Sequence, residues 1–332
     1  MIYTKTPLRM SFFGGGTDFQ SYFEQYGGSV LSTTFDKYCY VSVRHLPRFF
    51  DYKNQLTYSK IEKTVNVEEL EHPMVRNAMK YLDMHELCIN YDADLPARSG
   101  LGSSSSFAVG LLNAFHALKG QYVGKEQLSK EAIYVERVMC GEKGGWQDQI
   151  AAAYGGMNRI NFDSNGFEVV PVIIQQERKE KLNQNLMMFF TGFSRFSDEI
   201  EREKEQALKE KTSELRETMQ LVDEGEKVLV DRHGNLDEFG RLLDHAWKLK
   251  RGIGKKVSTD TLDEIYRVAK DNGALGGKLL GAGGGGFFAF YVPQERQECV
   301  KKALSKLLYI PFRFENSGSK VLYYHPEDYQ MD

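Results

Sequence analysis

The sequence predicts an α+β protein of two lobes. Its 332 residues exceed the size at which a single hydrophobic core usually stops growing, which favours two lobes with a cleft between them. Residues 1–175 mix short β-rich runs with helical stretches, whereas residues 196–252 form a long, heavily charged helical tract before a final mixed segment. This change of composition falls within 171–185, so we expect one lobe over 1–175 and a second over 176–332.

The first half contains a strand, a polar loop and a helix in direct succession. Residues 88–94 alternate apolar and polar side chains, as a half-buried strand does, and Pro96 ends that pattern. A loop of glycine and serine follows over 99–106. Apolar residues then recur at helical spacing over 107–118, and Gly120 supplies a C-terminal stop. The loop is therefore expected to lead into a helix that faces the core.

The second half contains a charged helical tract and a late apolar strand. From Ser197 to Val230 acidic and basic residues are densely mixed, so we expect a largely solvated helix or helical pair. Its apolar positions form only a sparse stripe at helical spacing: Ile200, Leu208, Leu215, Met219 and Val222. Residues 287–292 are rich in aromatic side chains and have the composition of a strand.

Charge and cysteine content narrow the class of protein. The net charge of −3 lacks the basic excess of proteins that bind nucleic acid, so we expect no such partner. Cys39, Cys88, Cys140 and Cys299 are widely scattered, which argues against a disulfide framework or zinc site and for free thiols in the cytoplasm. The most apolar stretch, residues 279–292, is too short and glycine-rich to cross a bilayer, so no membrane association is expected.

Three glycine-rich segments carry the chemical signal: residues 13–18, 99–106 and 281–286. The second precedes a predicted helix, whose N-terminal N–H groups and dipole attract an anion such as phosphate. Gly100 and Gly102 allow close backbone approach, and the four serines that follow can cap the helix or bind phosphate oxygens or a metal ion.

Two common nucleotide-binding motifs do not fit these segments. Gly281, Gly283 and Gly286 match the pattern G-x-G-x-x-G, but a dinucleotide-binding motif must open a helix, and here a predicted strand follows at 287–292. Neither the serine loop nor the late glycine cluster contains the Gly-Lys-Ser/Thr ending of a P-loop. The phosphate site is therefore of another kind.

In their order and spacing, residues 7–18 (PLRMSFFGGGTD), 96–104 (PARSGLGSS) and 278–286 (KLLGAGGGG) resemble the three motifs of the GHMP small-molecule kinases. The resemblance spans nearly the whole chain. It implies an N-terminal ATP-binding lobe similar to the ribosomal protein S5 domain 2-like fold and a ferredoxin-like C-terminal lobe.

The resemblance also implies ATP and Mg²⁺ as cofactors. The middle motif would wrap the ATP phosphates. The ATP-binding residues would be Ser99, Gly100, Leu101, Gly102, Ser103, Ser104 and Ser105. Residues 135–149 resemble the family's stretch that carries the magnesium ligand and a catalytic residue. In it Glu136 would hold Mg²⁺ together with a hydroxyl of Ser103 or Ser104, and we take Ser104 as the predicted metal ligand. One carboxylate, one hydroxyl and substrate phosphates are a suitable ligand set for Mg²⁺.

Asp148 and Arg9 are the catalytic residues that the resemblance implies. Asp148 would take the proton from an acceptor hydroxyl as that oxygen attacks the γ-phosphate. Arg9 matches the arginine that many sugar kinases of the family place beside this aspartate. An adjacent guanidinium keeps the carboxylate ionised but weakens it as a base, so positioning and charge stabilisation could contribute more than proton abstraction.

Asp18 matches the first-motif aspartate that contacts sugar hydroxyls in sugar kinases of the family, and Thr17 and Gly16 are grouped with it as substrate-binding residues. The chain departs from galactokinases, which usually have Glu-His where this sequence has Gly15-Gly16. It also departs from mevalonate kinases, where lysine is usual at the position of Arg9. Galactose and mevalonate are therefore disfavoured as acceptors.

The first motif, together with residues 145–149 and 154–156, most resembles the branch of heptose 7-phosphate kinases and fucokinases. The resemblance implies that the anomeric hydroxyl of D-glycero-D-manno-heptose 7-phosphate is phosphorylated to give the 1,7-bisphosphate. Lys143, Arg98 and Arg195 are candidates for contacting the acceptor's own phosphate.

The alternatives are a fucokinase-like or other sugar kinase of the family, and a non-catalytic ligand sensor that kept the fold. Because Arg9, Asp18, Glu136 and Asp148 are all present, a sensor is disfavoured. A monomer or homodimer is expected.

Overall fold

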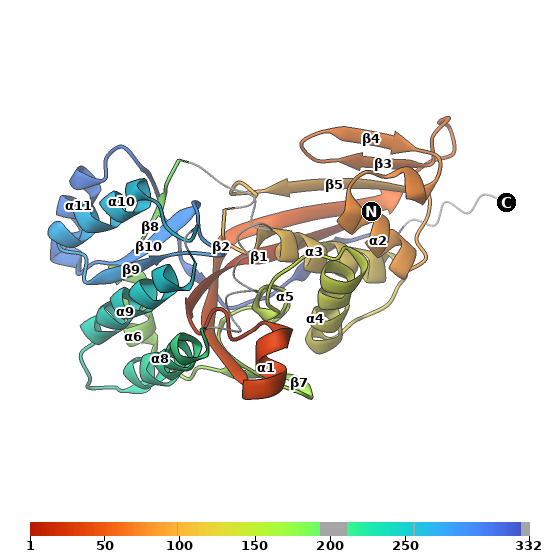
Figure 1. Cartoon of the computed structure of the whole chain (residues 1–332). Helices are drawn as coiled ribbons and strands as arrows, with labels where there is room; N and C mark the ends of the chain where they lie inside the picture. The colour runs from red at the N-terminus through yellow and green to blue at the C-terminus, as the bar shows by residue number, and fades with distance from the viewer. Residues whose placement is uncertain (98, 193–210, 255, 327–332) are drawn as a thin grey trace.

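The computed structural model describes residues 1–97, 99–192, 211–254 and 256–326. Two structural units lie side by side (Figure 1). One is built on a nine-stranded sheet and the other on a four-stranded sheet.

The larger sheet is organised around two long antiparallel strands, β1 and β2. β2 pairs with β1 along most of its length, with β5 through its C-terminal half and with β6 through its N-terminal half. The central path runs β13-β1-β2-β5-β3-β4, while β6 and β12 pair with β2, and β7 pairs with β6. The strands are β1 (Ile2–Phe13), β2 (Gly28–His45), β3 (Asn54–Thr57), β4 (Ile61–Thr64), β5 (Leu87–Ala93), β6 (Met157–Asp163), β7 (Gly166–Pro171), β12 (Phe314–Glu315) and β13 (Lys320–Tyr324).

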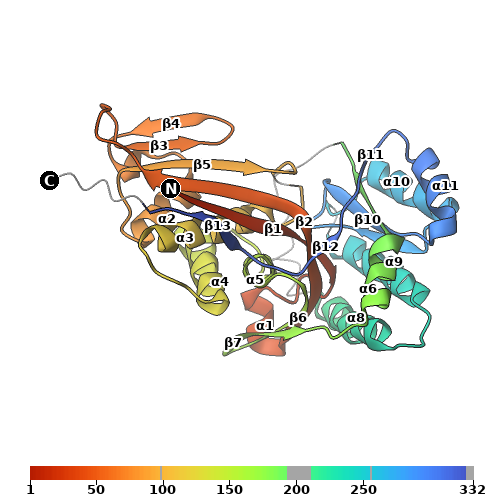
Figure 2. The ribbon, with the colours of Figure 1, turned by 180° about the vertical axis from the view of Figure 1, so that it is seen from behind.

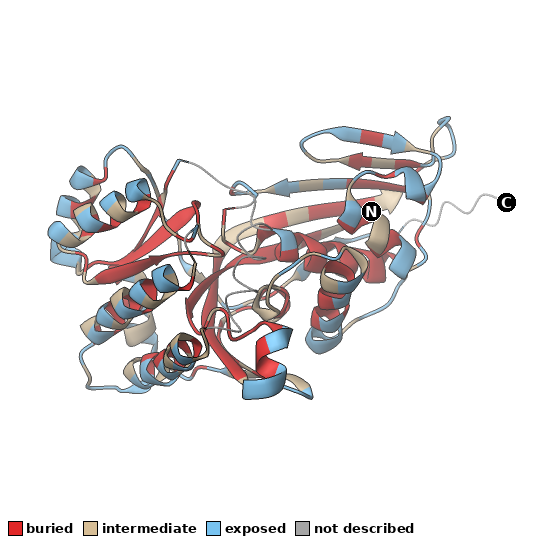
Figure 3. Cartoon of the chain, in the orientation of Figure 1, coloured by how far each residue is buried: buried red, intermediate tan, exposed pale blue. Residues whose placement is uncertain are grey.

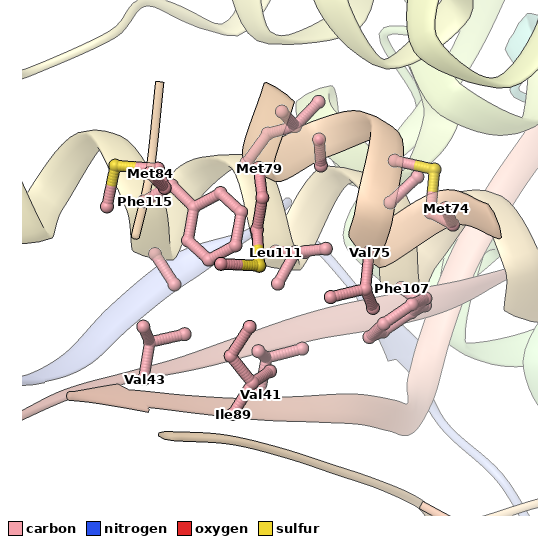
Figure 4. Close-up of a cluster of buried hydrophobic side chains, with 14 of the residues drawn as sticks. Val41, Val43, Met74, Val75, Met79, Met84, Ile89, Phe107, Leu111 and Phe115 are labelled. Carbon is pink, nitrogen blue, oxygen red and sulfur yellow. The ribbon is translucent and has the colours of Figure 1, made fainter. Parts of the chain in front are cut away.

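Helix α3 is the central helix of this unit. It packs on β1 and β2, and its apolar residues form one core with those of α2 and the sheet. Figure 4 shows this core, which includes Leu111 and Phe115 of α3, Met79 of α2 and Val41 of β2. The helical segments are α1 (Gln20–Tyr26), η1 (Val67–Glu69), α2 (Pro73–Tyr81), α3 (Ser103–Leu118), α4 (Lys125–Ile133), the π-helix η2 (Tyr134–Met139) and α5 (Gln147–Tyr154).

The predicted strand over 88–94 and helix over 107–118 are confirmed as β5 and α3. However, α3 begins at Ser103, so the serines form its first turn and do not extend the loop. Gly102 makes the turn that ends the loop. Its φ of 73° lies in the left-handed region, which glycine adopts without steric strain.

The smaller unit places helices around an antiparallel sheet of order β11-β8-β10-β9. β10, the strand predicted over 287–292, is buried along its whole length (Figure 3). The strands are β8 (Leu186–Phe190), β9 (Gly276–Leu279), β10 (Phe287–Tyr291) and β11 (Leu308–Ile310). The helices are α6 (Gln176–Asn185), α8 (Thr212–Val230), α9 (Asp237–Ile253), α10 (Asp260–Asp271), η3 (Gln294–Arg296) and α11 (Gln297–Ala303).

Helix α8 corrects the expectation of a largely solvated helix. One face of α8 packs against β1 and β2, with Leu215, Val222 and Leu229 fully buried. Gly225 is part of that face, because a Cβ there would lie 2.4 Å from a ring carbon of Phe13. A small residue such as glycine permits this close contact, but it is not one of the large apolar residues from which a helical stripe is recognised in a sequence. Ile200 and Leu208, which belong to the same expected stripe, lie outside the described residues.

The end of the chain returns to the larger sheet. β12 pairs with β2 and β13 pairs with β1, so the dark-blue strands lie against the first strands of the chain (Figure 2). The expected division at residue 175 stays a prediction, and the second lobe as predicted contributes to both sheets. All four cysteines are free thiols, as expected. Among the residues with a described position, no helix has the length and apolar character needed to cross a membrane.

Candidate active site

The three glycine-rich segments, far apart in the sequence, meet around one cavity. A Cβ on Gly281 would lie 2.2 Å from the Cα of Gly100, and one on Gly286 would lie 2.2 Å from the carbonyl oxygen of Ser99. The serine loop and the late glycine segment therefore pack backbone against backbone, which only glycine permits at these positions. The first segment completes the wall through Gly14 and Gly15.

The first turn of α3 forms the part of the cavity wall that is suited to binding an anion. The first hydrogen bond of the helix runs from the Ser106 N–H to the Gly102 carbonyl at 2.9 Å. The preceding N–H groups cannot bond within the helix and carry the positive end of its dipole. Gly102, Ser103, Ser104 and Ser105 line the cavity here, as the sequence predicts for residues that bind phosphates.

Arg9 and Asp148 form a bidentate ion pair beside this helix terminus. The Arg9 Nε lies 2.7 Å from Oδ1 of Asp148, and Nη2 lies 2.8 Å from Oδ2. The third guanidinium nitrogen donates to the carbonyl of Gly100 at 2.7 Å. Arg9 is 4% exposed, so it is fixed in place, while the Asp148 side chain keeps 22% exposure toward the cavity. The pair holds a carboxylate next to the predicted phosphate site.

Glu136 lies on the π-helix η2 and is directed toward the serines. It accepts hydrogen bonds from the hydroxyls of Ser104 and Ser105, each at 2.8 Å, and from the amide of Gln149. Glu136 is 1% exposed, so its carboxylate is buried against these donors and does not face solvent. Short π-helical segments inside helices frequently occur at functional sites because they redirect side chains.

Asp18, which also lines the cavity, is held by several donors. Its Oδ1 accepts from the backbone N–H of Gly16 at 2.9 Å, and its Oδ2 accepts from the Nε2 of Gln147 at 2.9 Å. Gly145 passes so close that a Cβ there would lie 1.9 Å from Oδ2 of Asp18. The carboxylate is therefore fixed before any substrate binds.

Both units contribute to the cavity wall. The smaller unit supplies residues from α8, α9, β9 and the late glycine segment: Thr218, Ala246, Lys250, Ile253, Lys278, Gly281 and Ala282. The site is therefore the cleft that a two-lobed protein was expected to have.

Some of the predicted site residues lie behind the wall. Thr17 is fully buried, and its hydroxyl donates to the carbonyls of Gly14 and Ser29 at 2.8 and 3.0 Å. Ser99 is also fully buried and its hydroxyl donates to the Pro96 carbonyl at 2.7 Å. Leu101 and Gly16 likewise do not line the cavity; the Leu101 carbonyl accepts from the N–H of Arg9, and the Gly16 N–H supports Asp18. These four residues shape the wall and support its neighbours.

Lys143 lines the cavity, whereas Arg98 and Arg195 lie outside the described residues. The sequence reasoning also missed several residues of the wall and its support, among them Arg137, Gln147 and Gln149. Gln147 and Gln149 flank Asp148 at alternate positions, and this spacing next to a catalytic candidate was an available signal.

Comparison with known proteins identifies the family. Residues 68–156 match the family model of the GHMP kinases N-terminal domain, and residues 227–310 match that of the GHMP kinases C-terminal domain. The D-glycero-alpha-D-manno-heptose 7-phosphate kinase of Campylobacter jejuni is 31% identical over 320 residues, which cover 92% of this chain and 93% of that protein.

Two further relatives cover most of the chain. A crystal structure of a D-glycero-D-manno-heptose 1-phosphate kinase from Bacteroides thetaiotaomicron superposes with a TM-score of 0.80 at 26% identity, covering 98% of this chain and all of that one. The bifunctional fucokinase/GDP-fucose pyrophosphorylase of Arabidopsis thaliana is 25% identical over 85% of this chain and matches over 29% of its own length.

The chain belongs to the GHMP kinases. The family and fold that the three motifs implied are thereby confirmed. GHMP kinases use ATP as phosphate donor, so the protein is an ATP-dependent kinase.

Proposed function

We propose that this kinase transfers the γ-phosphoryl group of ATP to the anomeric hydroxyl of D-glycero-D-manno-heptose 7-phosphate, forming the 1,7-bisphosphate and ADP. The C. jejuni relative with a heptose 7-phosphate kinase name matches over nearly the full length of both chains, which supports a sugar phosphate as acceptor. The observation that carries the proposal is the Arg9–Asp148 pair, which lines the same cavity as the first turn of α3 and the carboxylate of Asp18.

In this proposal the ATP phosphates bind at the first turn of α3. Gly100, Gly102, Ser103, Ser104 and Ser105 line the wall there, and backbone N–H groups at a helix N-terminus bind phosphate oxygens. Ser99 and Leu101 act from behind by fixing the loop.

Glu136 and Ser104 are proposed to hold Mg²⁺, which neutralises phosphate charge when bound. The donor set fits this ion. The carboxylate and the hydroxyls of Ser104 and Ser105 already converge, and all are hard oxygen ligands. Among Glu136, Ser104 and Ser105, Ser104 is the exposed residue, and its hydroxyl can turn toward a bound phosphate. Ser105 is 3% exposed, and its hydroxyl supports Glu136.

Asp148 is proposed to receive the proton of the acceptor hydroxyl. The acceptor oxygen forms a bond to the γ-phosphorus, the bond from that phosphorus to the bridging oxygen of ADP breaks, and the proton passes to a carboxylate oxygen. Both oxygens of Asp148 accept from Arg9, but each keeps a second lone pair. An anomeric hydroxyl is more acidic than an ordinary alcohol, so it gives up its proton more readily to a carboxylate.

Asp18 is proposed to accept hydrogen bonds from acceptor hydroxyls and so orient the sugar. Gly16 and Thr17 contribute by holding the first segment in place, through the Gly16 N–H and the buried Thr17 hydroxyl. Lys143 remains the candidate for meeting the acceptor's phosphate, since it lines the same cavity.

A panel of acceptors tests the proposal. ADP release is measured with ATP, Mg²⁺ and each of heptose 7-phosphate, fucose, galactose, mevalonate and homoserine, and phosphorus NMR of the product locates the new phosphate. We expect turnover with heptose 7-phosphate and a phosphate on C1. Turnover with fucose alone would favour the fucokinase alternative, and ATP binding without ADP release from any acceptor would favour a ligand sensor.

A further inference from the structure

Two buried polar atoms on residues that line the cavity have no hydrogen-bond partner in the described part of the chain. One is the hydroxyl oxygen of Ser11, a residue that is 6% exposed. The other is the side-chain carbonyl oxygen of Gln147. Both residues line the cavity. Buried polar groups are nearly always paired in folded proteins, so these two unpaired atoms need partners, which a molecule bound in the cavity can supply.

The Ser11 hydroxyl and the amide nitrogen of Gln147 both lie near the position of Gly15. A Cβ on Gly15 would lie 3.8 Å from the Ser11 hydroxyl and 3.8 Å from the Gln147 Nε2. Glycine therefore leaves a gap between the two polar side chains. Ser11 lies on β1 with Arg9 two residues before it, and side chains two apart on a strand share a face. The gap thus adjoins the Arg9–Asp148 pair.

The orientation of the Gln147 amide is defined by its neighbours. Only its nitrogen can donate to the carboxylate of Asp18, at 2.9 Å, so its oxygen is the unpaired atom. The preceding loop is held by Arg137, whose guanidinium donates to the carbonyls of Gly145 at 2.9 Å and Lys143 at 3.1 Å. The amide oxygen is therefore fixed before binding, as selective recognition requires.

We propose that Ser11 and Gln147 bind hydroxyl groups of the acceptor beside Asp18 and determine which sugar is accepted. This inference rests on the proposed function. A sugar hydroxyl donates to the Gln147 oxygen and accepts from Ser11, whereas an acceptor without hydroxyls there leaves both atoms unpaired. A serine hydroxyl moves between staggered positions by rotation about one bond, so Ser11 can meet the sugar without backbone movement.

The test is steady-state kinetics of Ser11→Ala with heptose 7-phosphate as acceptor. We expect the KM for the sugar to rise about tenfold while the KM for ATP stays within about twofold, because the lost hydrogen bond involves the acceptor alone. The melting temperature of the free variant should equal or exceed that of wild type, since the substitution removes an unpaired buried hydroxyl. A hydroxyl with a structural role would give a lower melting temperature.

Ser42→Ala is the matched control. Ser42 is also a buried serine on a long strand, but its hydroxyl accepts from Asn90 away from the cavity, so neither KM should change. Gln147→Met is a second variant, expected to raise the sugar KM more than Ser11→Ala because Asp18 also loses a hydrogen bond.

The outcomes separate this inference from the proposed function. If wild type phosphorylates heptose 7-phosphate and both variants keep the wild-type KM for it, the inference is wrong and the proposed function stands. If wild type does not turn over heptose 7-phosphate, the proposed function fails and this inference fails with it.

Discussion

Asp148 is bound through both carboxylate oxygens to one guanidinium, which determines what a single substitution there should do. Asp148→Asn keeps the size of the side chain but removes the charge and the proton acceptor. We expect kcat to fall by about 10²- to 10⁴-fold, the usual contribution of a general base, while ATP still binds. A coupled enzyme assay of ADP release measures kcat, and calorimetry measures whether the variant still binds ATP.

Asp223→Asn provides the matched control for Asp148. Asp223 also pairs with an arginine, Arg159, at 2.6 Å, but its side chain is 65% exposed on the surface. Loss of an exposed pair has little effect on stability and none on the cavity. If Asp148→Asn keeps the wild-type kcat, Asp148 has no role in the mechanism.

At the scale of elements, a buried polar contact joins α3 to α4. The Nε2 of His116 lies 2.6 Å from Oε2 of Glu131, with both side chains less than one-tenth exposed. Burial raises the pKa of Glu131, but hydrogen bonds from His116 and Gln127 outweigh this effect and hold the pKa below its ordinary value. The carboxylate therefore contributes stability above the pKa of the unfolded chain, and this contribution is lost as pH falls through the folded pKa.

Glu131→Gln should lower the free energy of unfolding by about 1–2 kcal/mol at pH 7 and by less at pH 4, because below the ordinary pKa of 4.5 the contribution of the carboxylate in wild type has begun to fall. Urea unfolding at both pH values measures this. Glu126→Gln is the control: Glu126 is also on α4 and pairs with Lys130, but it is 65% exposed, so its effect should stay below about 0.5 kcal/mol. An equal loss at both pH values for Glu131→Gln would contradict the assignment.

For the whole molecule, the backbone contact between Gly100 and Gly281 links the units. Gly281→Ala should destabilise the protein for two reasons. Its φ of 73° is unfavourable for alanine, at about 1–2 kcal/mol, and the added Cβ would lie 2.2 Å from the Gly100 Cα. Because the serine loop must then shift, we also expect the KM for ATP to rise about tenfold or more.

Gly120→Ala isolates the second effect. Gly120 has a φ of 70°, but no atom lies within 4 Å of the added Cβ, so this variant carries only the backbone cost. Thermal unfolding and ATP kinetics of the two variants give the comparison. Equal melting temperatures and ATP KM values would show that the contact between the units is unimportant.

The sequence alone determined to which family the chain belongs and where the loop and the helix terminus of the predicted phosphate site would lie. Local chemistry explains this success: glycines at positive φ, a run of serines and a following apolar periodicity mark a loop and a helix terminus wherever the rest of the chain lies. The charged residues Arg9, Asp18, Glu136 and Asp148 were predicted as site residues because they stand at fixed places in those motifs.

Only the tertiary structure decided which of these atoms meet and which do not. Ser99 and Thr17 lie in the same motifs as Ser104 and Asp18, but the direction of each side chain depends on packing between distant segments, so their hydroxyls bond to the backbone instead. The unpaired atoms of Ser11 and Gln147 could not be recognised from sequence, since a missing partner is a property of everything around an atom. Short-range patterns specify elements and motifs, whereas the distances that define chemistry arise when the two units close around one cavity.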